Sequence, residues 1–272
     1  MSLLKKLLNK EEYFENLAAS MRHLIIEIFD YLEIPEYEKK SDGSNEPVYP
    51  INRRHLMEQG DIFNSYSIRF KKPNQTLHSL RIGLYSIPVM NFLGIKDKEW
   101  RKKFFAASLC HDEAKSFVED IVDKEKEFTE RDMDKMKNHV DYYRIYGSQD
   151  EDVKAVIERH HYYRLMNSYP ENPESRETPE IKYCSSRIGI LDTHDAAATR
   201  KINGLNVADT NKVKQVLMRD YAKLDMSYNG DVFPKTEMNG AEFIFQMYDS
   251  HIFGRGNPLN PFEDFDSLLS LK

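Results

Sequence analysis

Imidazole and carboxylate side chains recur along the middle of the chain, with one or two in each successive apolar stretch. Buried groups of this kind are costly unless they are paired or bound to a metal. Neutral imidazole suits first-row transition metals, and a carboxylate can bridge two ions. Ligands of both types on several helices are how a metal site is built inside a helical bundle. The set consists of His78, His111, Asp112, His139, His160, His161 and Asp192.

The order of these residues predicts two ions that share one carboxylate. The first ion is assigned to His78, His111, Asp112 and Asp192, and the second to Asp112, His139, His160 and His161. Two ions on one carboxylate can activate a water and clamp a phosphate. Lys115 follows His111 by four residues and shares its predicted helix face, so we expect it to touch a phosphate or the leaving oxygen.

Any one histidine is more often a satisfied core or surface residue than a ligand. Adjacent histidines alone are weak evidence, because neighbours on a helix point about 100° apart. The prediction therefore depends on the ordered set. We interpret the remaining histidines as ordinary core or surface residues: His23, His55, His194 and His251.

Helical periodicity dominates the elements that must position these ligands. Asp97 and Thr129 are predicted helix caps, Thr178 precedes a proline at a first helical position, and Gly94 ends a helix. We find no repeat and no strand pattern, so the predicted fold is all-α, a bundle around a metal centre. The predicted helices span about 14–32, 75–94, 97–115, 129–147, 150–161, 178–200, 209–224 and 237–253.

The chain is expected to divide near residue 72. Residues 1–72 form an N-terminal helical and loop region, regulatory or dimerising, and residues 73–272 form the catalytic domain with C-terminal helices. The first leucines could place a helix on a membrane surface, but acidic residues follow at once from Glu11. A docking or homodimer helix is therefore the favoured interpretation.

Composition narrows the function classes. A formal net charge of -6 argues against binding a nucleic-acid polymer through bulk electrostatics. The two cysteines, Cys110 and Cys184, cannot build a disulfide framework, which favours a reducing compartment. No apolar run approaches the length of a membrane span, and the start of the chain lacks a secretory signal pattern. Cytoplasm is the expected location.

At the ligand positions the chain resembles the HD superfamily of metal-dependent phosphohydrolases, and within it the HD-GYP group of cyclic di-GMP phosphodiesterases. The likeness covers about Gln75 to Arg200, with motifs in family order. "LCHDEAK" is similar to "LHDIGK", and "HHYYRLMNSYP" aligns without a gap to "HHExxDGxGYP". "TLHSLRIG", "FTERDMDKMKNHV" and "RIGILDTHDAAAT" are similar to the helices that carry the first, middle and last ligands.

The resemblance implies a metal-dependent phosphodiesterase with two divalent ions, iron or manganese, and a metal-bridging hydroxide as nucleophile. It implies a small-molecule nucleotide substrate, with a cyclic dinucleotide, cyclic di-GMP, favoured. Asp112 and Lys115 would be catalytic, and Lys115, Lys201 and Tyr169 would contact the substrate.

Several positions depart from the family pattern. Asn74 stands where some members have a glutamate for a third metal, which favours two ions. Tyr162 replaces the glutamate after the paired histidines, Leu165–Met166 replace "DG", and Ser168 replaces the first glycine of "GYP". The phosphate-gripping "RPYR" aligns with "KING", which keeps only Lys201. The ligand set is complete while the recognition loop is altered.

Two other functions stay open. The altered loop allows a non-catalytic nucleotide-binding sensor, although a sensor does not require two ions. A di-iron oxygenase of the HD type is the other alternative, but such proteins usually lack consecutive histidines like His160–His161.

Overall fold

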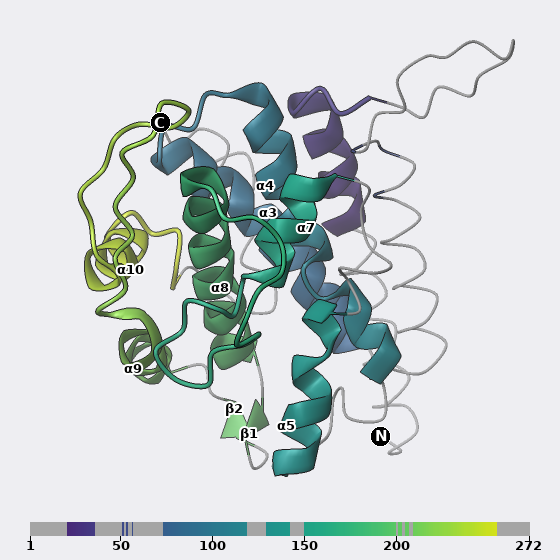
Figure 1. Cartoon of the computed structure of the whole chain (residues 1–272), viewed down its shortest axis with the longest axis vertical. Coiled ribbons are helices and arrows are strands. Elements are labelled where there is room, and N and C mark those ends of the chain that lie inside the picture. Colours follow the sequence, from purple (N-terminus) through teal and green to yellow (C-terminus); the bar gives the residue numbers. More distant parts are fainter. Residues whose placement is uncertain are drawn as a thin grey trace, which may run out of the picture.

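The computed structural model describes residues 21–35, 51, 53, 56, 73–118, 129–141, 150–199, 201–202, 205–206 and 209–254, with 73–76, 116–117, 201–202 and 205–206 described by backbone alone. In this part the chain is helical, as predicted (Figure 1). The α-helices are α3 Pro73–Phe92, α4 Lys98–Cys110, α5 Glu130–Lys137, α7 Glu151–Glu158, α8 Pro179–Thr199, α9 Thr210–Tyr221 and α10 Gly240–Asp249. They are accompanied by a 3-10 helix, η1 Glu113–Val118, and two strands, β1 Lys201–Ile202 and β2 Leu205–Asn206.

The helix starts follow the predicted caps. The Asp97 side chain accepts a hydrogen bond from the Trp100 amide at 2.8 Å, and Thr129 forms a complete capping box with Asp132. These bonds satisfy amides that have no partner within the helix. Gly94, with φ +65°, follows the end of α3 in the left-handed conformation that glycine tolerates.

Two predicted helices end earlier than expected, and a third is interrupted. The stretch predicted as 97–115 is α4 up to Cys110, a turn at His111 and Asp112, and then η1, and α7 ends at Glu158 instead of His161. Helix α5 ends at Lys137 and residues 139–141 are helical again, while the predicted end near residue 147 lies outside the described residues. Each end lies beside a candidate ligand, whose side chain bonds to the last turn of its own helix.

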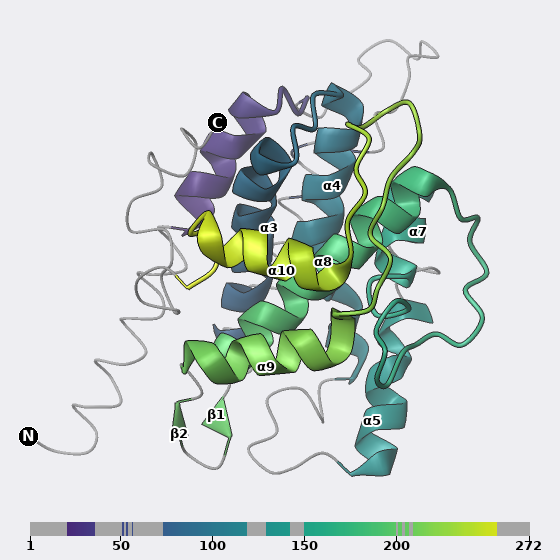
Figure 2. The same cartoon turned by 90° about the vertical axis from the view of Figure 1, so that its left-hand side faces the viewer.

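The ligand-bearing helices form the body of the molecule. In Figure 1, α3, α4, α7 and α8 lie together, and α9 packs on α8 with α10 beside it (Figure 2). Helix α8 is buried without interruption from residue 183 to residue 195. A helix buried on all sides is apolar all round, so polar groups inside it need partners or a function.

The described part of the N-terminal region packs into the same core. Residues 21–31 are helical, and the predicted apolar face, including Met21, Ile25 and Ile28, is buried. The rings of Phe29 and Phe105 meet edge to face, with centroids 6.1 Å apart. Residues 21–34 therefore stabilise the bundle that carries the site, while the predicted role of residues 1–72 in regulation or dimerisation stays a prediction.

The strands are an addition to the predicted elements. Lys201 pairs with Asn206 and Ile202 with Leu205 in a two-residue antiparallel register. Such a pair is too short to produce a period-2 pattern, so the sequence carries no detectable strand signal.

Candidate metal centre

All seven predicted ligands converge in the bundle. They form two groups of four, and in each group one ligand atom per residue lies within 4.8 Å of the others. Asp112 belongs to both groups, and every member is buried. The first group is His78, His111, Asp112 and Asp192, and the second is Asp112, His139, His160 and His161.

The first group is compact around the His78 imidazole. Its Nε2 lies 3.0 Å from Asp192 Oδ1 and 3.3 Å from Asp112 Oδ2. His111 Nε2 lies 3.2 Å from the same nitrogen and 3.3 Å from Asp112 Oδ2. Two imidazoles and two carboxylates thus point at one spot between α3, α8 and the end of α4.

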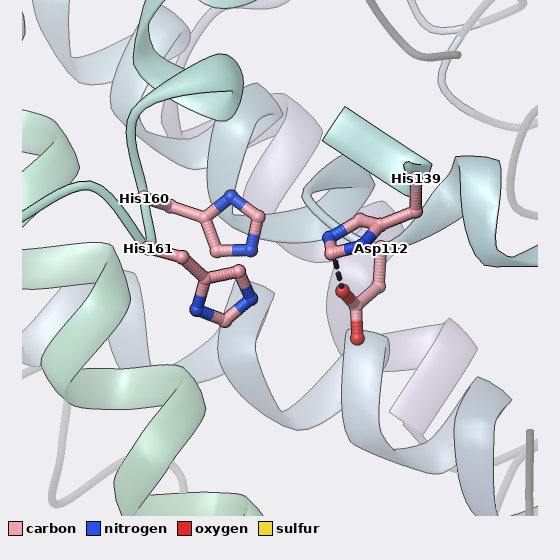
Figure 3. A group of neighbouring side chains, drawn as sticks. All are labelled: Asp112, His139, His160 and His161. Carbon is pink, nitrogen blue, oxygen red and sulfur yellow. Dashed lines mark ion pairs between the residues drawn. The ribbon is translucent and has the colours of Figure 1, made fainter. Parts of the chain in front are cut away.

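The second group approaches the opposite oxygen of Asp112. His139 Nε2 lies 3.6 Å from Asp112 Oδ1, while the His160 and His161 rings face them from the turn after α7 (Figure 3). The centroids of His160 and His161 are 3.8 Å apart. His161 Nε2 is also 3.6 Å from Asp192 Oδ2, so the two groups adjoin on this side as well.

Three ligands are oriented by the same device. The Nδ1 atoms of His111, His139 and His160 lie at 2.9, 2.6 and 2.5 Å from the carbonyl oxygen three residues earlier. A carbonyl only accepts, so Nδ1 of each ring carries a hydrogen and Nε2 is the atom directed toward the centre. The last carbonyls of a helix lack the amide four residues on, so each ring adds a donor at a helix end. The Met136 and Ile157 carbonyls also accept from backbone amides just after the helix, those of Asn138 and of Arg159 and His160.

His78 is oriented by a pair of residues that the sequence analysis did not assign. Its Nδ1 donates to Asp195 Oδ2 at 2.7 Å, and Arg81 grips Asp195 with Nε at 2.6 Å and Nη2 at 2.7 Å. Both partners are buried. Arg81 and Asp195 each lie three residues after a ligand, His78 and Asp192, on the same helix face. That spacing is the signal that could have revealed them.

We expect Asp195→Asn to weaken metal binding by roughly 10- to 100-fold, the usual cost of losing a carboxylate behind a ligating histidine. The amide keeps the size of the side chain but no longer fixes the His78 tautomer as a carboxylate does. Competition with a chromophoric chelator measures the affinity. Asp225→Asn, an exposed aspartate 3.4 Å from Lys182, is the matched control. Equal affinities in the two variants would contradict the orienting role.

Lys115 and Tyr169 lie beside the ligands, but Lys115 is not on the helix that was predicted to carry it. Helix α4 ends at Cys110, and Lys115 lies in η1, where its ammonium is 2.5 Å from Asp112 Oδ2. The Tyr169 ring tilts over the His161 ring, with centroids 4.5 Å apart. The side chains of Lys201 and Asn74 lie outside the described residues, so their predicted roles stay predictions.

The buried histidines fall into a neutral set and a charged set, depending on whether carboxylates lie close enough to outweigh burial. It lowers the pKa of His139 to about 4 and of His160 to about 3, and it holds the pKa of His161 well below its usual range. Burial acts on His78 in the same direction, but hydrogen bonds to Asp112, Asp192 and Asp195 outweigh it and raise the pKa to about 10. The three histidines of the second group are therefore neutral and ready to bind, whereas a metal must displace a proton from His78. The pKa of His111 is also raised, because the charge of Asp112 and hydrogen bonds to Asp112 and Asp192 outweigh burial.

The carboxylates are ionised. Burial opposes this for Asp112, but the charges of His111 and Lys115 outweigh it and hold the pKa well below the usual range. The pKa of Asp192 is lowered as well, against burial, by hydrogen bonds from His111 and His78. Both oxygens of the Asp112 and Asp192 carboxylates are thus available as anionic ligands.

We expect the metal-free protein to lose stability as the pH falls from 6.5 toward 4. In this window the unfolded chain protonates His139, His160 and His194, whereas burial keeps their folded-state pKa values at about 4, about 3 and about 4. His78 is protonated in both states here, and the lowered pKa values of Asp112 and Asp192 matter only at lower pH. Glu113, whose pKa burial raises to about 7, is protonated in the folded state within this window and offsets part of the loss. Each of these neutral histidines lowers the free energy of unfolding by about 2 kcal/mol at pH 5.

Thermal melts in chelator at pH 7, 6 and 5 measure this effect. The Tm should fall by at least about 10 °C between pH 7 and 5. His160→Gln removes one of the contributing groups, so its Tm should fall less over the same range. A flat or rising Tm would contradict the neutral state of these imidazoles.

The donor set fits a transition metal. Within the described residues, the Nε2 atoms of His139, His160 and His161 are buried and have no hydrogen-bond partner. Buried polar atoms are seldom left unpaired, and such an atom indicates a missing ion or water. Three imidazoles with carboxylate oxygens are ligands that iron, manganese and zinc accept.

The other described histidines lie outside both groups, as predicted. His23 is exposed and 3.4 Å from Glu27, and His251 is exposed. His194 stacks on Phe253 with centroids 3.9 Å apart. His55 falls outside the described residues.

The described part of the chain is thus a helical protein with a buried cluster of histidines and aspartates that could hold metal ions. Compared with protein-family models, with curated proteins and with solved structures, the chain matches none. Among the described helices, none combines the length and the apolar character needed to cross a membrane.

Proposed function

We propose that the protein is a metal-dependent phosphodiesterase with two divalent ions, iron or manganese, which hydrolyses a cyclic dinucleotide, with cyclic di-GMP favoured. One observation carries the proposal. Asp112 directs Oδ2 toward His78 and His111 and Oδ1 toward His139, so its two oxygens serve different ligand groups. A carboxylate arranged in this way suits a bridge between two ions.

Two ions bound there would supply Lewis-acid stabilisation of a phosphoryl group and would lower the pKa of a water toward neutrality. The residues of the chain have complementary tasks. Asp112 sets the spacing of the two groups, and the Lys115 ammonium beside it is assigned to the leaving alkoxide. Tyr169 covers the His161 ring and limits the access of water to that side of the centre.

Charge supports an anionic substrate. The charge of two divalent ions exceeds that of Asp112 and Asp192, and Lys115 adds to the excess. The neutral imidazoles do not offset it, since burial holds the pKa of His139 and His160 far below neutrality. A phosphodiester compensates the excess, whereas a neutral small molecule does not. The resemblance of the ligand motifs to HD-GYP sequences favours a cyclic dinucleotide within this class.

The test is elemental analysis of protein purified without oxygen, followed by a hydrolysis panel. The panel contains cyclic dinucleotides, linear dinucleotides and a nitrophenyl phosphodiester, each with iron-loaded and manganese-loaded protein. We expect metal-dependent hydrolysis, with a cyclic dinucleotide turned over fastest. Tight cyclic-dinucleotide binding without turnover would instead select a sensor, and oxygen uptake with an organic substrate would select a di-iron oxygenase.

A further inference from the structure

The loop after the paired histidines folds back over a ligand. The amides of Arg164 and Tyr169 both donate to the His161 carbonyl oxygen, at 3.5 and 3.4 Å. The Leu165 amide donates to the Asp220 carbonyl of α9 at 2.8 Å, which ties the loop to the bundle. Arg164 therefore sits on a fixed turn directly beside the second ligand group.

The charge of Arg164 is only partly balanced. Its Nη2 lies 2.6 Å from Asp220 Oδ2, but Arg219 Nε lies 2.6 Å from Oδ1 of the same carboxylate. One buried carboxylate thus serves two guanidinium groups, which leaves an excess of positive charge. Arg219 faces solvent with 58% of its side chain exposed, whereas that of Arg164 is 19% exposed.

Arg164 also has an unused donor. Its Nε is buried and has no hydrogen-bond partner among the residues that the structure describes. A buried N–H of a charged group without an acceptor is costly. The guanidinium fork of Nε and Nη matches the two oxygens of a phosphate, which would satisfy this donor.

Arg164 is a permanent cation, because a guanidinium does not lose its proton in proteins. Its amide bonds to the carbonyl of the ligand His161, so this cation is carried on the same turn as the second ligand group. Arg164 is not needed only to hold the loop on α9, because the hydrogen bond from the Leu165 amide to the Asp220 carbonyl already does so.

We propose that Arg164 is the anion-recognition residue of this centre and binds a phosphate group of the substrate through Nε and a neighbouring Nη. This inference deepens the proposed function and rests on it for the identity of the substrate. The role is distinct from that expected for Lys201 in the altered "KING" segment. It gives the loop a source of phosphate affinity that no sequence motif assigned.

The test compares Arg164→Met and Arg164→Lys with Arg219→Met, which removes the other partner of Asp220. Inorganic phosphate is titrated calorimetrically into metal-loaded protein, and cyclic di-GMP hydrolysis is measured alongside. Arg164→Met should weaken phosphate binding roughly 10- to 100-fold, the cost of charged hydrogen bonds. Its KM should rise by a similar factor with little change in kcat. Arg164→Lys should recover only part of the affinity, and Arg219→Met should match the wild type.

Phosphate binding separates this inference from the proposed function. If the wild type hydrolyses no diester, a selective loss of phosphate affinity in Arg164→Met still supports Arg164 as the anion ligand. Wild-type phosphate affinity in Arg164→Met, or no phosphate binding by the metal-loaded wild type, would overturn it. The inference would also be overturned if both Arg164 variants had less bound metal, a lower Tm and weaker phosphate binding, because that pattern indicates a structural role.

Discussion

Asp112→Asn is expected to empty both ligand groups, whereas variants of other ligands should empty only one. The amide cannot supply two anionic oxygens, and Asp112 is the residue that the groups have in common. Metal affinity should fall by more than the roughly 10- to 100-fold cost of losing an outer partner. In the hydrolysis proposed above, turnover should fall by more than the roughly 10²- to 10³-fold cost of losing one oxyanion donor.

Elemental analysis distinguishes this result from a general loss of structure. His78→Ala should spare the second group and His160→Ala the first, so each should retain about half the metal of the wild type. Asp134→Asn, on an exposed aspartate, is the carboxylate control. Removing the Asp112 charge also takes away the carboxylate that lies 2.5 Å from the buried Lys115 ammonium, which costs about 3–5 kcal/mol. His160→Ala avoids that problem, because burial lowers its pKa to about 3 and the ring is neutral.

The shared role of Asp112 would be contradicted if Asp112→Asn lost metal from only one of the two ligand groups. If Asp112→Asn retained as much metal as His78→Ala while folding normally, the two groups would be independent sites. Equal retention in all three ligand variants would lead to the same conclusion.

Gly189→Ala should have an effect out of proportion to one methyl group. Alanine is favoured over glycine in a helix by about 1 kcal/mol, so an unconstrained site would gain stability. At Gly189, however, an added Cβ would lie 2.1 Å from the His160 carbonyl oxygen and 3.1 Å from Tyr221 Oη. The backbone of the His160–His161 turn would have to move away from α8. We therefore expect loss of metal from the second group and destabilisation of about 1–3 kcal/mol or more.

Gly83→Ala is the matched control for this substitution. It lies inside α3, and its added Cβ would meet the end of the Leu109 side chain at 3.1 Å, which can shift more easily than backbone. Metal content and Tm are measured for both variants. Wild-type values in Gly189→Ala would show that the close approach of α8 to His160 is not needed.

The ligands could be predicted because their identity depends on residue type and order along the chain. Helix starts were equally accessible, since caps such as Asp97 and Thr129 act within a few residues of their helix. The early end of α4 was not, because an imidazole bonded to a carbonyl replaces the usual glycine signal there. Local spacing places Arg81 and Asp195 each beside a ligand, but it does not show that they bond to one another, because they are 114 positions apart.

The convergence of helix ends has an electrical consequence. The carboxyl end of a helix carries about half an electron of negative charge, and α4, α5 and α7 all end within two residues of a ligand. The backbone itself therefore attracts cations to this point, in addition to the side-chain carboxylates. A cation on Nε2 also makes the Nδ1 hydrogen of the same ring more acidic, which strengthens its bond to the helix carbonyl. Bound metal ions should thus slow amide hydrogen exchange in the final turns of these helices, so that exchange rates of the backbone would show whether ions are bound.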